Sequence, residues 1–132
     1  MRNPQPASLE LRLQARPEFA PLLRERVRMW LEEAGATKTE TFEVLLAVTE
    51  AFANAVEHPD DPRSHVVDVE GTIGDQAVTV SIRDYGTWQG EDTKKEEGGM
   101  GLVMMEELMD AVRVECFQDG TTVTMQRRLA LR

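Results

Sequence analysis

The sequence predicts an α+β fold, a two-layer α/β sandwich in which helices cover one face of a mixed, mostly antiparallel sheet. Strand and helix periodicities follow one another in the order strand, two helices, two strands, helix, two strands. Short turn sequences separate each of the two later strand pairs, as in hairpins. A chain of 132 residues fits a single domain.

The first elements are a strand and a helix. Residues 8–15 alternate leucine with polar residues, which is the period-two pattern of a half-buried strand. From Pro17 the apolar residues recur on one helical face, and Gly35 ends this helix.

A second helix follows directly. Thr37 or Thr39 supplies an N-cap, and Pro59 stops the helix after about His58. We expect its buried stripe to consist of Phe42, Leu45, Thr49, Phe52 and Val56.

The remaining strands form two predicted hairpins. His65–Ile73 and Ala77–Arg83 are rich in β-branched residues and join across Gly74-Asp75. The final hairpin pairs residues 111–117 with residues 121–129. Between the hairpins, residues 84–99 are polar and lack periodicity, which is typical of a functional or mobile segment. A helical pattern resumes over residues 100–109.

Composition narrows the function classes. The net charge of −9 argues against direct binding to nucleic-acid phosphates, which needs a basic face. No apolar stretch reaches the roughly 20 residues of a membrane span, and residues 1–7 lack the apolar core of a secretory signal. We therefore expect a cytoplasmic protein. The single cysteine, Cys116, lies in an apolar run and is expected in the core.

Three groups of residues are candidates for a chemical function, and each also has a purely structural explanation. Glu50, Asn54 and His58 recur every four residues on one face of the second helix, which a solvated face would also explain. Residues 83–86, Arg-Asp-Tyr-Gly, end a strand and would suit an ordinary turn. Residues 98–102, Gly-Gly-Met-Gly-Leu, open a helix, where free amides attract phosphate but a hinge is equally plausible.

Taken together and in this order, the segments resemble the GHKL ATPase superfamily, whose ATP-binding fold is the Bergerat type. The N-box is TEAFANAVEH (49–58), and the glycine boxes are RDYGTW (83–88) and EGGMGLVMMEELMD (97–110). The closing hairpin carries DGTTVTM (119–125). Within the superfamily, the short length and two leading helices resemble the anti-sigma-factor serine-protein kinases of the RsbW type. The resemblance covers residues 8–129 of a single domain spanning 1–132.

The resemblance implies that ATP and Mg²⁺ are the cofactors and assigns roles to individual residues. Asn54 corresponds to the Mg²⁺ ligand, Glu50 to the general base, and Asp84 to the acceptor for the adenine amino group. The remaining implied nucleotide contacts are Gly86, Gly98, Gly99, Gly101, Leu102 and a hydroxyl from Thr121 or Thr122. His58 ends the N-box, where it serves either as a nucleotide contact or as a helix cap.

The implied function is that of an ATP-dependent serine/threonine-protein kinase and anti-sigma factor. Such a kinase binds a sigma factor, phosphorylates a STAS-domain anti-anti-sigma factor, and commonly acts as a homodimer. The sequence departs from the family pattern at Trp88, where a second glycine is usual, and in a short acidic segment before Gly98. These departures motivate the alternative of a non-catalytic nucleotide-binding switch that regulates a protein partner by binding alone.

Overall fold

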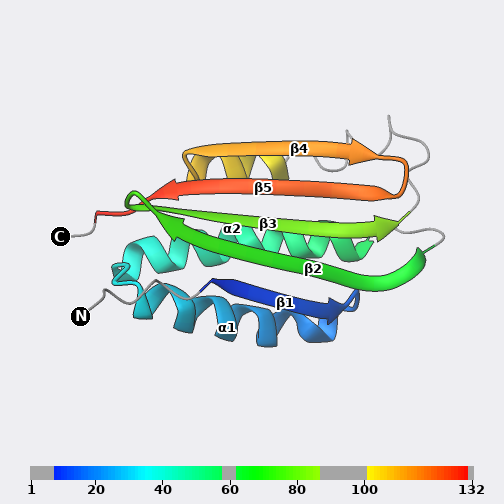
Figure 1. Cartoon of the computed structure of the whole chain (residues 1–132), viewed down its shortest axis with the longest axis horizontal. Coiled ribbons are helices and arrows are strands. Elements are labelled where there is room, and N and C mark those ends of the chain that lie inside the picture. Colours follow the sequence, from blue (N-terminus) through cyan, green and yellow to red (C-terminus); the bar gives the residue numbers. More distant parts are fainter. Residues whose placement is uncertain (1–7, 58–61, 87–100, 131–132) are drawn as a thin grey trace.

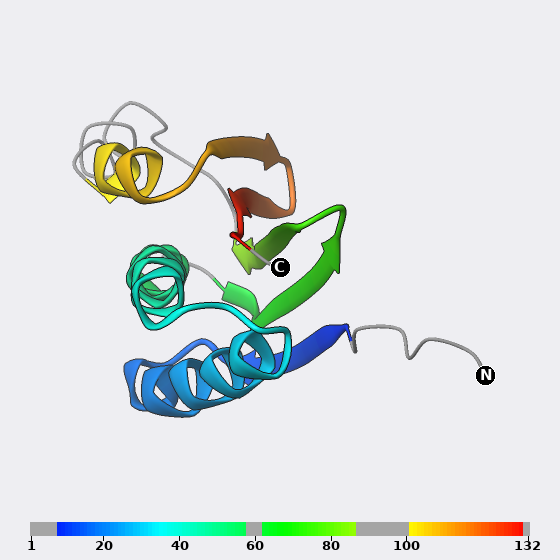
Figure 2. The ribbon, with the colours of Figure 1, turned by 90° about the vertical axis from the view of Figure 1, so that its left-hand side faces the viewer.

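All helices of the described chain lie on one face of a single sheet (Figure 1, Figure 2). The computed structural model describes residues 8–57, 62–86 and 101–130. The α+β class and the two layers predicted from the sequence are confirmed. None of the helices in these ranges is long and apolar enough to cross a membrane. In chain order the elements are β1 (Leu9–Gln14), a 3-10 helix (Pro17–Phe19), α1 (Ala20–Glu33), α2 (Lys38–Glu57), β2 (Pro62–Gly74), β3 (Ala77–Gly86), a helix over residues 101–108, β4 (Ala111–Phe117) and β5 (Gly120–Arg128).

The sheet has five strands in the order β1-β2-β3-β5-β4, and every pairing between them is antiparallel. Gly74 pairs with Ala77, so the β2–β3 turn consists of Asp75 and Gln76. Both turn residues have positive φ, 54° and 62°, which matches the twist of a two-residue hairpin. The prediction of Gly74-Asp75 as the turn was therefore wrong by one residue, because pairing extends further along β2 than its β-rich run suggested.

The start of α2 is fixed by reciprocal hydrogen bonds between Thr37 and Glu40. The Glu40 amide donates to Thr37 Oγ1 at 3.1 Å, and the Thr37 amide donates to Glu40 Oε1 at 2.8 Å. Glu40 Oε2 also accepts a hydrogen bond from the Ala130 amide at 2.6 Å, which ties the chain after β5 to this helix end. The hydrogen bond from the Thr37 backbone is the largest influence that lowers the pKa of the buried Glu40 carboxyl.

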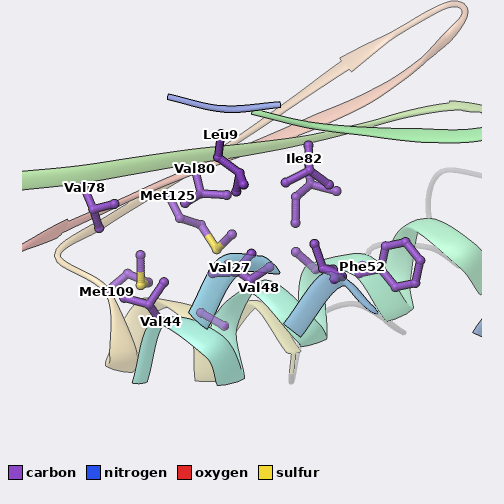
Figure 3. Packing of buried hydrophobic residues seen from close by; sticks show 14 of the residues in the cluster. Leu9, Val27, Val44, Val48, Phe52, Val78, Val80, Ile82, Met109 and Met125 are labelled. Carbon is purple, nitrogen blue, oxygen red and sulfur yellow. The ribbon is translucent and has the colours of Figure 1, made fainter. Parts of the chain in front are cut away.

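The buried face of α2 differs from the predicted stripe. Phe42 is 60% exposed, whereas Phe52 is buried as expected. Three alanines of the helix, Ala47, Ala51 and Ala55, belong to the core, although they were not counted in the predicted stripe. In Figure 3, Val44 and Val48 lie across from Val80 and Met125 of the sheet. The buried residues of the central face are Val44, Ala47, Val48, Ala51, Phe52 and Ala55.

Candidate functional site

A mostly apolar pocket brings together the three segments that the sequence analysis singled out. Asn54 of α2, Asp84 of β3, Leu102 of the 101–108 helix and Thr121 of β5 all line it. The pocket has a volume of about 90 Å³, more than a single water requires. Its other walls are Ala51, Ala55, Ile82, Met105, Val114 and Val123.

The polar end of the pocket is formed by Asp84 and Thr121, which are directly paired on β3 and β5. The Thr121 amide donates to Asp84 Oδ1 at 3.3 Å. Asp84 is 8% exposed and Thr121 is 6% exposed. Within the described chain, the buried Thr121 Oγ1 has no hydrogen-bond partner. An unpartnered buried hydroxyl costs about 1–3 kcal/mol, so this atom is well suited to a ligand or water in the pocket.

The register of β5 separates the two threonines that the sequence left as alternatives. Successive side chains of a strand point to opposite faces, and Thr121, not Thr122, lines the pocket. Thr122 pairs with Arg83, whose side chain is on the outer face of the sheet. The candidate hydroxyl in this pocket is therefore that of Thr121.

Gly120 allows β5 to begin directly against Asp84. Its φ of 151° lies in the range that favours glycine. A Cβ at this position would overlap the Asp84 carbonyl oxygen. The absence of a side chain at residue 120 thus helps to set the distance between the two polar residues of the pocket.

Asn54 reaches the pocket because it borders the buried face of α2. It is half-buried and lies between Ala51 and Ala55, both of which line the pocket. The alternative that this helix face is simply solvated therefore does not hold at Asn54.

Glu50 lies one turn before Asn54, next to the second glycine box. It does not line the pocket itself, but a Cβ built on Gly101 would lie only 2.5 Å from Glu50 Oε2. The missing side chain of Gly101 thus leaves room for the carboxylate at the start of the 101–108 helix. The structure therefore brings the acidic helix face and the glycine box side by side.

Hydrogen bonds on the outer face of the sheet hold the end of β3 that carries Asp84. Tyr85 Oη donates to Asp68 Oδ2 at 2.5 Å, and Arg12 donates to both oxygens of Asp68 at 2.8 and 2.9 Å. The Arg12 guanidinium is the main cause that lowers the pKa of Asp68, and the bond to Asp68 raises the pKa of Tyr85. Arg83 stacks on the Tyr85 ring at 4.7 Å. These contacts tie together three strands beside the pocket.

The remaining residues named from the sequence are Gly86 and four that the structure does not describe. Gly86 ends β3 opposite Pro62, two residues after Asp84. His58, Gly98 and Gly99 lie outside the described residues, as does Trp88.

The expectation that Cys116 lies in the core was wrong, because this residue is exposed on β4, one of the two edge strands. An outermost strand has a neighbouring strand on one side only, so an apolar run there does not ensure burial. The apolar pocket walls Ile82, Val114 and Val123 were not predicted. The alternation along β3, β4 and β5 was the signal that could have identified them.

The chain as a whole is similar to known proteins. The family model described as "Histidine kinase-like ATPase domain" matches residues 13–127. An anti-sigma F factor from Clostridium acetobutylicum is 30% identical over 93% of this chain and 94% of its own length. The serine-protein kinase RsbW of Bacillus subtilis is 29% identical, with 92% of this chain and 85% of that protein covered.

A solved structure is similar to this chain in both fold and sequence. The crystal structure of the RsbU and RsbW domains of Rv1364c from Mycobacterium tuberculosis superposes with a TM-score of 0.78 and 30% sequence identity. The match covers 93% of this chain and 32% of that longer chain.

Proposed function

Because this chain belongs to the histidine kinase-like ATPase domain family, we propose that it is an ATP-dependent serine/threonine-protein kinase that acts as an anti-sigma factor. In this proposal it binds a sigma factor and phosphorylates a STAS-domain anti-anti-sigma factor. The similarity to proteins named anti-sigma F factor and serine-protein kinase RsbW supports both activities. The single observation that carries the proposal is the pocket shared by Asn54, Asp84 and Thr121, with Glu50 beside it.

The pocket suits the adenine ring of ATP. Apolar walls such as Ile82 and Val123 offer surface for a flat ring, while polar groups stand at one end. The Asp84 carboxylate can accept a hydrogen bond from the adenine amino group, where guanine presents a carbonyl oxygen. The Thr121 hydroxyl, unpartnered among the described residues, supplies a further hydrogen bond.

The residues also suit Mg²⁺ bound together with phosphates. The described residues contain no group of three or more His, Cys, Asp or Glu side chains that could hold a metal by themselves. Mg²⁺ commonly takes most of its ligands from phosphate oxygens and water, with one or two from the protein. The neutral amide oxygen of Asn54 is the protein ligand in this proposal.

Glu50 is the proposed base. ATP with Mg²⁺ supplies the phosphoryl group, and the protein has to orient and deprotonate the acceptor hydroxyl. The Glu50 carboxylate would accept this proton from the serine or threonine of the partner. Its position against Gly101 places it beside the glycine box whose amides would face the phosphates.

The test is phosphate transfer from labelled ATP, with Mg²⁺, to a panel of STAS-domain proteins. We expect Glu50→Gln to keep ATP binding but to lower transfer by about 10²–10⁴-fold, the usual contribution of a general base. Glu107→Gln is the matched control, because Glu107 is exposed on the 101–108 helix and outside the pocket. Full transfer by Glu50→Gln would remove Glu50 as the base.

The same assay separates the kinase from its alternative. If the unchanged protein binds ATP but transfers phosphate to none of the STAS-domain proteins, the non-catalytic switch is the better description. A homodimer also belongs to the proposal, and sedimentation of the purified protein tests it.

A further inference from the structure

Cys116 lies at the edge of the pocket, on the same face of the sheet. It pairs with Thr121 across β4 and β5, and Thr121 lines the pocket. Val114, two residues earlier on β4, also lines the pocket. Because side chains two residues apart on a strand share a face, Cys116 points to the pocket side. Directly opposed residues have Cβ atoms about 4.5–5.5 Å apart, so the Cys116 side chain is a neighbour of Thr121.

The thiol is accessible, and its neighbour indicates a ligand site. Cys116 is exposed and is the single cysteine of the sequence, so no disulfide within the chain competes for it. Thr121 Oγ1 is buried and without a hydrogen-bond partner among the described residues. An accessible thiol therefore stands beside the polar group that the pocket offers to a ligand.

We propose that Cys116 is a redox modification site at which a mixed disulfide with a low-molecular-weight thiol blocks nucleotide binding. The inference rests on the proposed nucleotide-binding function of the pocket. A group attached to Sγ would extend next to Thr121, beside a pocket of only about 90 Å³. Modification would thus lower ATP affinity by steric exclusion, and removal of the group would restore it.

The chemistry is thiol–disulfide exchange. The Cys116 thiol releases its proton to solvent, and the thiolate attacks one sulfur of a low-molecular-weight disulfide. A new S–S bond forms at Cys116 as the S–S bond of the small disulfide breaks, and the other half leaves as a thiolate that takes up a proton. The cysteine sulfur is oxidised and the departing half is reduced, so no other oxidant is needed. An excess of small thiol reverses the exchange.

The experiment compares Mg²⁺-ATP binding by calorimetry before and after treatment with glutathione disulfide, with mass spectrometry to confirm one attached glutathione. We expect at least about a tenfold loss of affinity, equivalent to about 1.4 kcal/mol, and full recovery after dithiothreitol. Bound ATP should also slow the reaction of Cys116 with the disulfide. The melting temperature of the modified protein shows whether it remains folded.

A thiol moved by one residue is the matched control. Glu115 is exposed and its side chain points to the opposite face from Cys116, so the double variant Glu115→Cys/Cys116→Ser carries its thiol away from the pocket. Glutathionylation of this variant should leave ATP affinity unchanged, and Cys116→Ser alone should be insensitive to the disulfide.

The outcomes distinguish the two proposals. If the untreated protein fails to bind ATP, both the proposed nucleotide-binding function and this inference are refuted. If untreated protein binds ATP and the Cys116-modified protein binds equally well, the inference alone is overturned. An equal loss after modification at residue 115 would overturn it too, because the effect would not depend on the pocket face.

Discussion

The contact between Gly101 and Glu50 makes Gly101→Ala the most informative substitution in this protein. An alanine Cβ would lie 2.5 Å from Glu50 Oε2 and 3.2 Å from Cδ, whereas ordinary contacts are 3.4–4 Å. The obstructing atoms are the end of a flexible side chain. The carboxylate would therefore move by about 1 Å and leave the backbone in place.

The expected effect is a loss of catalysis without a loss of stability. A misplacement of about 1 Å in a reacting group can cost roughly 10²-fold in rate. The backbone itself accepts alanine, because Gly101 is helical and alanine is favoured over glycine in a helix by about 0.5–1 kcal/mol. We thus expect phosphate transfer to fall about 100-fold while the free energy of unfolding changes by less than about 1 kcal/mol.

The assay is single-turnover transfer from labelled ATP, together with ATP binding and urea unfolding. Gly74→Ala is the control, since a Cβ there meets nothing within 4 Å. In a Glu50→Gln background, Gly101→Ala should add little to the loss, because both changes act on the same carboxylate. An unchanged transfer rate would refute the reasoning, as would a loss of stability above about 2 kcal/mol.

Four other substitutions test the pocket and its supports. Asn54→Ala should abolish the Mg²⁺-ATP binding detected by calorimetry. It should change the free energy of unfolding by less than about 2 kcal/mol, because the Asn54 side chain only borders the core, and a larger change would indicate a structural role. Asp84→Asn should weaken ATP binding and reduce the preference for ATP over GTP in competition experiments, since an NH₂ donor replaces one acceptor oxygen of the carboxylate. Gly120→Ala should lower stability by roughly 1–3 kcal/mol in thermal melts, because its φ is 151° and its Cβ would overlap the Asp84 carbonyl. Glu40→Gln should lower the urea unfolding free energy at pH 7. The pKa of Glu40 is below its ordinary 4.5, chiefly because the Thr37 amide donates a hydrogen bond to its carboxylate. The stabilisation of the fold by this ionised carboxylate is therefore present above about pH 4.5 and disappears as the pH falls through the folded pKa. A difference from the unchanged protein that does not shrink as the pH falls below 4.5 would contradict this origin.

Local patterns in the sequence were sufficient for the elements and for their order. Period-two leucines predicted β1, and a threonine N-cap at residue 37 or 39 predicted the start of α2; the Thr37–Glu40 bonds show that Thr37 is the cap. These features depend on neighbours within one turn or one strand, so they can be recognised in the sequence without knowing which helix or strand packs against them. The family resemblance added Glu50, Asn54 and Asp84 as site residues, and their roles stay predictions.

Tertiary structure alone decided which side chains share the pocket. Pairing of β5 with β3 places Thr121, rather than Thr122, beside Asp84. Contacts with the sheet rotate α2 so that Ala51 and Ala55 are buried, Phe42 is exposed and Asn54 reaches the pocket. Strand register and helix rotation depend on contacts between residues far apart in the chain, and a one-residue change in register turns every side chain to the other face. Local periodicity does not contain that information, so only the folded chain determines which groups meet.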